Sequence, residues 1–163
     1  MSTTPKTLRI LGIDPGSRAT GYGIIDQSGN RTIFISCGVI RPNLKKTFSS
    51  RLLEIHSGIS EVIETFSPDR VAIEDVFVSI NPRTALKLGH SRGVLLLAAM
   101  QHHLEIHEYS ARKVKQAVVG YGQASKEQIQ QVVRVLLNLS ATPSRDAADG
   151  LAIALCCANH VAL

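Results

Sequence analysis

Residues 8–26 read LRILGIDPGSRATGYGIID, and this stretch decides the class of fold. Its apolar run ends at Asp14, and the Pro-Gly pair that follows favours a tight turn before a second strand over residues 20–26. A third strand is predicted over residues 32–40, after a Gly-Asn pair. Three consecutive strands joined by short turns predict an antiparallel meander.

The rest of the chain alternates helical and extended patterns. Apolar residues recur every three or four positions over residues 48–66, which predicts a helix lying on a sheet, and the run at residues 70–74 predicts a strand. A strand reached through a helical crossover is expected to run parallel to an earlier one. The remaining predicted elements are a helix over 82–102, a strand over 103–109, and helices over 111–118, 126–137 and 144–159. This order indicates an α/β fold in which helices cover a sheet.

Composition and length set limits on what the protein can be. The 163 residues, 44% of them hydrophobic, suffice for one compact core, and neither repeats nor a long linker divide them. We therefore expect one domain over residues 1–163, with a polar tail at 1–6. No run of about 18 apolar residues suggests a membrane span, so a cytoplasmic protein is expected. The three cysteines, Cys37, Cys156 and Cys157, form no CxxC pair, which favours reduced buried thiols over disulfides or a zinc finger.

Positive charge is concentrated in the middle of the chain. The formal net charge is +5, which suits a polyanionic partner. The basic residues of the middle stretch are Arg83, Lys87, Arg92, Arg112, Lys113, Lys115 and Lys126, against only Glu105 and Glu108 before Lys126. We expect this stretch to supply the surface that faces phosphates.

Four carboxylates stand apart from the other acidic residues. Asp14 and Glu74 each end an apolar strand, while Asp146 and Asp149 lie three residues apart on one face of the last predicted helix. If they meet, their like charges require bound cations, and a set of oxygen ligands favours Mg²⁺ or Mn²⁺.

Taken singly, each carboxylate also has a structural explanation. Asp-Pro-Gly is a common turn, Glu74 could be a polar strand end, and Asp146 could complement a helix dipole. Asp149 is harder to explain in this way, because it precedes the apolar segment at residues 151–155, where a buried carboxylate needs a partner.

Five motifs in register resemble the RuvC family of bacterial Holliday-junction resolvases. They are LGIDPGSRATGYGII, VAIEDVF, ALKLGHSRGV, RKVKQAVVGYG and DAADGLAIA, and the resemblance runs from about Leu8 to the end. It implies a ribonuclease H-like fold, with a five-stranded mixed sheet and helices on both faces, assembled as a homodimer. It also implies an endonuclease that resolves four-way DNA junctions by paired nicks in recombination and repair, with a branch-migration motor complex as a partner.

The resemblance assigns roles to particular residues. Two Mg²⁺ ions, roughly 3.5 to 4 Å apart and replaceable by Mn²⁺, would grip one phosphate. Asp14 would bridge the ions, Glu74 would complete one coordination shell, and Asp146 with Asp149 would complete the other. Lys126 could offset charge that grows on the phosphate.

Contacts with DNA outside the metal site are implied or expected as well. Phe77 matches the aromatic residue that the family places at the junction crossover, and Lys115 and Lys126 match basic residues near the scissile strand. Arg83 and Arg92 are expected to join them from the basic stretch. The family often has a basic residue where this chain has Ile80, so a contact there is in doubt.

Two other functions and two other candidate metal sites account for parts of this pattern. A sugar-kinase or actin-like ATPase would need two such domains around a nucleotide. A non-catalytic junction-binding relative would keep the basic surface and lose carboxylates, yet all four are present. The candidate metal ligands His102, His103 and His107, and the pair Cys157 and His160, supply no full ligand set and are expected to be structural.

The second predicted helix suggests how a dimer could form. From Val94 to Met100 it is apolar on every side for two turns, whereas a surface helix would show polar residues at each turn. One side could pack on its own sheet, and the other on the same helix of a second copy across a two-fold axis. The alternative is a helix buried within one larger core.

Overall fold

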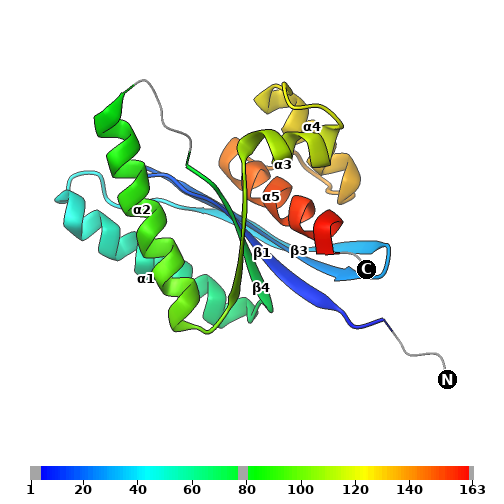
Figure 1. Cartoon of the computed structure of the whole chain (residues 1–163), viewed down its shortest axis with the longest axis horizontal. Coiled ribbons are helices and arrows are strands. Elements are labelled where there is room, and N and C mark those ends of the chain that lie inside the picture. Colours follow the sequence, from blue (N-terminus) through cyan, green and yellow to red (C-terminus); the bar gives the residue numbers. More distant parts are fainter. Residues whose placement is uncertain (1–4, 77–80, 162–163) are drawn as a thin grey trace.

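The computed structural model describes residues 5–76 and 81–161. Its centre is a five-stranded sheet in the order β3-β2-β1-β4-β5 (Figure 1). The strands are β1 (Leu8–Asp14), β2 (Thr20–Ser28), β3 (Arg31–Ile40), β4 (Arg70–Glu74) and β5 (Glu105–Tyr109). The first three pair antiparallel, β4 lies parallel to β1, and β5 lies parallel to β4. The predicted meander and the predicted parallel crossover are both confirmed.

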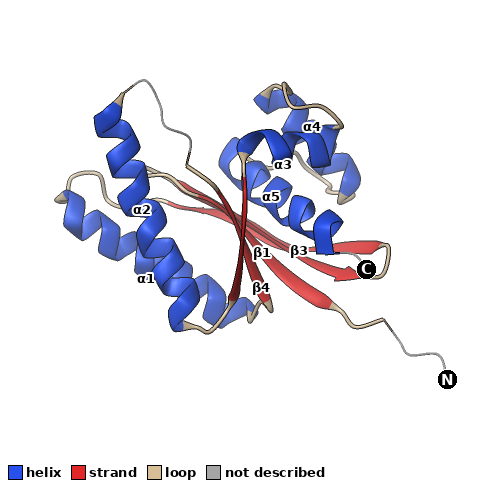
Figure 2. Ribbon diagram, in the orientation of Figure 1, coloured by secondary structure: helices blue, strands red, loops and turns tan. Residues whose placement is uncertain are grey.

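Helices cover both faces of this sheet (Figure 2). On one face lie α1 (Phe48–Phe66) and α2 (Pro82–Gln101), and on the other lie α3 (Ala111–Val119), α4 (Lys126–Leu136) and α5 (Arg145–Val161). Successive side chains of a strand point to opposite faces. Accordingly Leu11 and Ile13 of β1 pack with α1 and α2, whereas Ile10 packs with α5. The α/β fold predicted from the sequence pattern and the helices on both faces that the family resemblance implied are confirmed.

The element boundaries agree closely with the sequence-based expectations. The first helix and the fourth strand have the predicted limits, residues 48–66 and 70–74. The strand predicted from His103 begins two residues later, at Glu105, because His103 adopts a left-handed backbone (φ 57°) that turns the chain out of α2. The last helix runs two residues beyond its predicted end.

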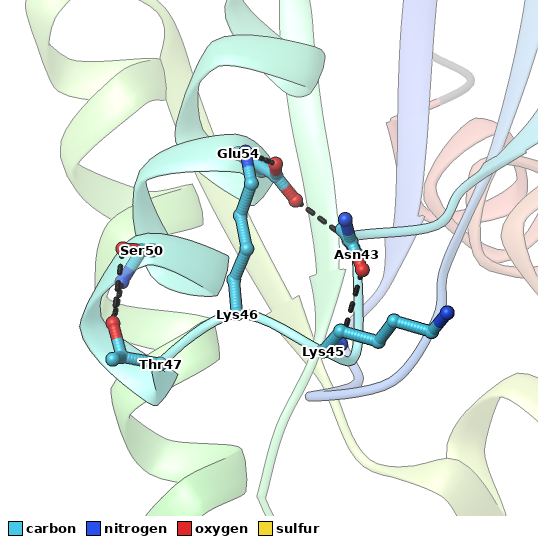
Figure 3. Close-up of polar contacts among 6 residues, drawn as sticks. All are labelled: Asn43, Lys45, Lys46, Thr47, Ser50 and Glu54. Carbon is cyan, nitrogen blue, oxygen red and sulfur yellow. Dashed lines mark hydrogen bonds and ion pairs between the residues drawn. The ribbon is translucent and has the colours of Figure 1, made fainter.

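The loop before α1 is tied to the first turns of that helix (Figure 3). The Thr47 hydroxyl accepts a hydrogen bond from the Ser50 amide at 3.3 Å and caps the helix. The Glu54 carboxylate accepts a hydrogen bond from the backbone amide of Asn43 at 2.6 Å and another from the Lys46 ammonium at 2.5 Å. These contacts fix where α1 begins.

Glycines let α5 lie directly on the backbone of β1 and β2. A Cβ atom added to Gly21 would lie 1.8 Å from the carbonyl oxygen of Asp146, and one added to Gly12 would lie 2.2 Å from that of Gly150. Because Gly21 pairs with Asp14 across the sheet, this close approach brings the N-terminal turns of α5 to the end of β1. The glycines therefore position the last helix beside the first strand's carboxylate.

The helices, the cysteines and the N-terminal residues bear on three smaller expectations. Within residues 5–76 and 81–161, no helix is both long and apolar enough to cross a membrane. Cys156 and Cys157 are buried free thiols, as predicted, whereas the free thiol of Cys37 is only partly buried. Of the expected tail, Pro5 and Lys6 are exposed and lie outside the sheet, and residues 1–4 are not described.

Candidate active site

Asp14 and Glu74 lie side by side because they end adjacent parallel strands. The last paired residues of β1 and β4 are Ile13 and Ile73, and one carboxylate follows each of them. Burial raises the pKa of Asp14 to about 9, with further contributions from the charges of Glu74 and Asp149 and from a hydrogen bond to Glu74. Burial also raises the pKa of Glu74, although the hydrogen bond from Asp14 opposes that rise. The two carboxyl groups therefore share a proton at neutral pH.

Lys126 brings a positive charge from helix α4 to this pair of strand-end carboxyl groups. It is the first residue of α4, whose start is fixed by a capping box between Ser125 and Gln128. Its ammonium donates to Asp149 Oδ2 at 2.5 Å, and the Asp149 side chain is only 17% exposed. This ion pair supplies the partner that a buried Asp149 was expected to need.

The charges of the cluster do not balance. Burial lowers the pKa of Lys126, but the hydrogen bond to Asp149 and the charges of Asp14 and Glu74 outweigh it and raise the pKa overall. Glu74, Lys126 and Asp149 line a pocket of about 170 Å³. Three carboxyl groups thus face one bonded ammonium, and the proton on Asp14 reduces the remaining negative charge.

Asp146 lies one turn before Asp149 on α5. Its backbone carbonyl presses against Gly21, opposite Asp14. Its side chain makes no hydrogen bond or ion pair with the other three carboxylates in the described ranges, and no trio of His, Cys, Asp or Glu there forms a ready metal site. Asp14, Glu74 and Asp149 thus interact electrostatically with one another and with Lys126, whereas no such interaction links the Asp146 side chain to them among the described residues. The complete ligand set stays a prediction.

Arg92, expected to contact DNA, holds the end of β4 instead of extending into solvent. Its side chain is 13% exposed, and its Nε donates to the carbonyl oxygen of Glu74 at 3.0 Å. Its Nη2 donates to Glu108 Oε1 at 2.7 Å and lies 3.7 Å from Asp75 Oδ1. These contacts explain Arg92 as a residue that positions Glu74, a role that sequence reasoning missed.

The other predicted DNA contacts have different surroundings. Lys115 lines the pocket that holds Glu74 and also a larger adjoining cleft. Arg83 is exposed in the first turn of α2. Phe77 and Ile80 fall outside the described residues. The DNA contacts at Lys115, Arg83 and Arg92 remain predictions.

Three of the histidines that were not expected to bind metal have local side-chain partners. His102 Nδ1 contacts the Ala98 carbonyl, and His107 lies 2.7 Å from Glu105. His160 contacts the carbonyl oxygen of Cys156 at 2.7 Å. These contacts agree with structural roles.

Comparison with known proteins places the chain in a family. Residues 10–157 match the family model described as "Crossover junction endodeoxyribonuclease RuvC". The chain is 52% identical over 147 residues to the protein of that name from Legionella pneumophila (strain Philadelphia 1), covering 90% of this chain and 84% of the relative. It is 49% identical over 156 residues to the Geobacter sulfurreducens protein of that name, covering 96% and 95%.

A solved structure agrees with these sequence matches. The structure described as "T. thermophilus RuvC in complex with Holliday junction substrate" has a TM-score of 0.88 and 32% sequence identity to this chain, covering 95% of each. The ribonuclease H-like fold that the motifs implied is thereby confirmed. The fold, the shared end of β1 and β4, and the matches over most of the length agree: this chain belongs to the RuvC family of crossover junction endodeoxyribonucleases.

Proposed function

We propose that this protein resolves four-way DNA junctions by hydrolysing one phosphodiester bond in each of two opposed strands. The observation that carries this proposal is the cluster of Asp14, Glu74, Asp149 and Lys126, which opens beside a basic cleft. The family relationship and the T. thermophilus complex support DNA junctions as the substrate. The cleavage would serve recombination and repair, with a branch-migration motor as the expected partner.

The donor atoms at the site fit divalent cations. Carboxylate oxygens are the ligands that Mg²⁺ and Mn²⁺ prefer. The raised pKa of Asp14, caused first by burial and then by the charges of Glu74 and Asp149, agrees with a site where a bound cation would stabilise the ionised carboxylates. Asp14, Glu74, Asp146 and Asp149 would hold two Mg²⁺ ions, replaceable by Mn²⁺. When bound, such ions activate water and stabilise the leaving oxygen. Their binding requires the loss of the proton on Asp14.

The protein's own residues would position the scissile phosphate. Lys126 stands among the carboxylates, where its ammonium can offset negative charge that develops on the phosphate. Lys115, on the wall shared with the basic cleft, can bind a neighbouring phosphate. Arg92 keeps Glu74 in place through the backbone of β4.

Paired nicking requires two such sites, and α2 offers a surface for a dimer. Leu86, Leu97 and Met100 are 65%, 52% and 60% exposed and lie on one face of this helix. Leu95 is fully buried in the chain's own core, so the predicted interface includes Leu97 but not Leu95. The exposure of Leu97 and Met100 favours this interface over the alternative of a helix buried within one core. A two-fold axis through this face would make the patch self-complementary.

A direct test compares a synthetic four-way junction with a linear duplex of the same sequence. Wild-type protein should nick the junction with Mg²⁺, and with Ca²⁺ it should bind without cutting, because the looser Ca²⁺ shell fails to align water and leaving group. Glu74→Gln should bind and not cut, whereas the matched control Glu61→Gln, on the exposed side of α1, should cut normally. Efficient cleavage by both Glu74→Gln and Asp14→Asn would refute the assigned site.

A further inference from the structure

A large cleft adjoins the carboxylate pocket and has no role in the chemistry described so far. It has a volume of about 970 Å³ and lies between the residues after β4, the start of α3 and the loop at residues 120–123. Ala111 and Lys115 line both this cleft and the smaller pocket that contains Glu74. Whatever occupies the cleft therefore lies next to the scissile phosphate.

One wall of the cleft is suited to bind a phosphate. Arg112 lies in the first turn of α3, a turn with no acidic residue, and Lys115 lies one turn later on the same helix. Within the described ranges, neither Arg112 nor Lys115 forms an ion pair within 4 Å. Two uncommitted cations near a helix N-terminus attract a phosphate group.

The loop is shaped around the Arg112 side chain. A Cβ atom added to Gly122 would lie 2.8 Å from Arg112 Cγ and 3.3 Å from its Nε. Because Gly122 lacks that atom, the Arg112 side chain can lie across the loop. The cationic wall and the loop that carries Tyr121 are therefore in direct contact.

Tyr121 places an aromatic ring at this cleft. Tyr121 is 48% exposed, whereas Tyr109 is 7% exposed and Tyr22 is partly buried. Gly120, with φ 85°, ends α3 and turns the chain toward Tyr121. An exposed ring beside cationic side chains is the arrangement on which single-stranded nucleic acids stack their bases.

We propose that this cleft holds one unstacked nucleotide next to the scissile phosphate, with its base on Tyr121 and its phosphate on Arg112 and Lys115. The cleft volume of about 970 Å³ lies within the range of typical ligand pockets, about 300 to 1,000 Å³. The cleft can therefore hold a single nucleotide, but it is too small for a duplex. This inference rests on the proposed function, because the nucleotide belongs to a DNA strand held for cleavage. A base held there would help to determine where the strand is cut.

The test removes the base and the ring separately and together. Junctions carrying an abasic site at each position around the mapped cut are titrated in Ca²⁺ with wild type, Tyr121→Ala and the matched control Tyr121→Phe. At one position, loss of the base should weaken wild-type and Tyr121→Phe binding about tenfold, as expected for one stacked base. Tyr121→Ala should bind the intact junction about tenfold less tightly and be insensitive to the missing base. Arg112→Gln should reduce the slope of log affinity against log salt by about one.

Three outcomes would overturn the inference, and they are distinguishable. Tyr121 also borders a depression made with Val119 and Val132, so thermal melting of each variant is measured in parallel. In the first outcome, Tyr121→Ala has a lower Tm than wild type, and each abasic site weakens its junction binding by the same factor as it weakens wild-type binding. The ring then has only a packing role. If ring and base act independently at all positions while wild type binds and cuts the junction, the subsite fails and the proposed function survives. If wild type neither binds nor cuts any four-way junction, both fail.

Discussion

Replacing Asp14 by Asn should stabilise the metal-free protein at alkaline pH, although it removes a predicted metal ligand. The native pKa of Asp14 is about 9, against 3.8 for a free carboxyl group. The burial of this group therefore lowers the free energy of unfolding. This loss is absent below pH 4, grows as the pH rises toward 9 and is constant above it. An amide has no such cost, and it can still donate a hydrogen bond to Glu74.

The size of the effect follows from these two values. Between pH 3.8 and pH 8, each pH unit lowers the free energy of unfolding by about 1.4 kcal/mol. The upper bound on the loss at pH 8 is therefore about 6 kcal/mol. Because Glu74 shares the proton with Asp14, we assign about half of this, roughly 3 kcal/mol, to the substitution. The same reasoning gives less than about 1 kcal/mol at pH 5. For a chain of this length, 3 kcal/mol corresponds to a rise in Tm of about 6 to 12 °C.

The assay is thermal unfolding in EDTA at pH 5 and pH 8, followed by circular dichroism. Asp14→Asn should melt above wild type at pH 8 and within about 3 °C of it at pH 5, and Glu61→Gln on the exposed side of α1 should follow wild type at both. Added Mg²⁺ should raise the Tm of wild type much more than that of Asp14→Asn, because binding to the native state stabilises it. A variant that melts below wild type at pH 8, or by the same margin at both pH values, would refute the buried, proton-sharing pair.

Other substitutions test how the site is positioned and paired. Arg92→Met should lower stability by about 2 kcal/mol and reduce the rate of cutting more than junction affinity in Ca²⁺, since it frees the backbone of Glu74; an equal loss of affinity would instead favour a phosphate contact. Gly21→Ala should cost at least about 1 to 3 kcal/mol in chemical denaturation, because its Cβ would meet the carbonyl of Asp146; unchanged stability and activity would contradict the close approach of α5. Leu97→Glu should leave the fold intact, sediment as a monomer and yield nicked rather than linear product from a cruciform plasmid; a monomeric wild type that linearises such a plasmid would refute the dimer.

The regular elements of this fold are readable from local sequence because their signals are local. The apolar stripe of α1 ends at Phe66, two residues before a proline, and the strand at residues 70–74 is a short apolar run with a charged residue at each end. The meeting of Asp14 with Glu74 also follows from sequence, since adjacent parallel strands end at the same edge of the sheet.

What could not be read from local patterns depends on contacts distant in the sequence. Arg92 looked like one more member of a basic stretch, and only the fold shows it bound to the backbone of β4 and to Glu108. The close packing of α5 left a trace in Gly21 and Gly23, which alternate along one face of β2, but glycine spacing alone does not say which helix approaches. The cleft at Tyr121 is likewise formed by segments that the sequence keeps apart.

The central claim is metal-dependent, paired cleavage of a branched DNA by the carboxylate cluster, and mapping the cuts on each strand of a synthetic four-way junction tests it most directly. Denaturing gels of wild-type digests should show one nick in each of two opposed strands, symmetric about the crossover, with Mg²⁺ or Mn²⁺ and none with EDTA. The ends should be sealed by a ligase, and Glu74→Gln should leave all four strands whole. Cutting that persists in EDTA, that is as fast on linear duplex, or that survives Glu74→Gln would contradict the account.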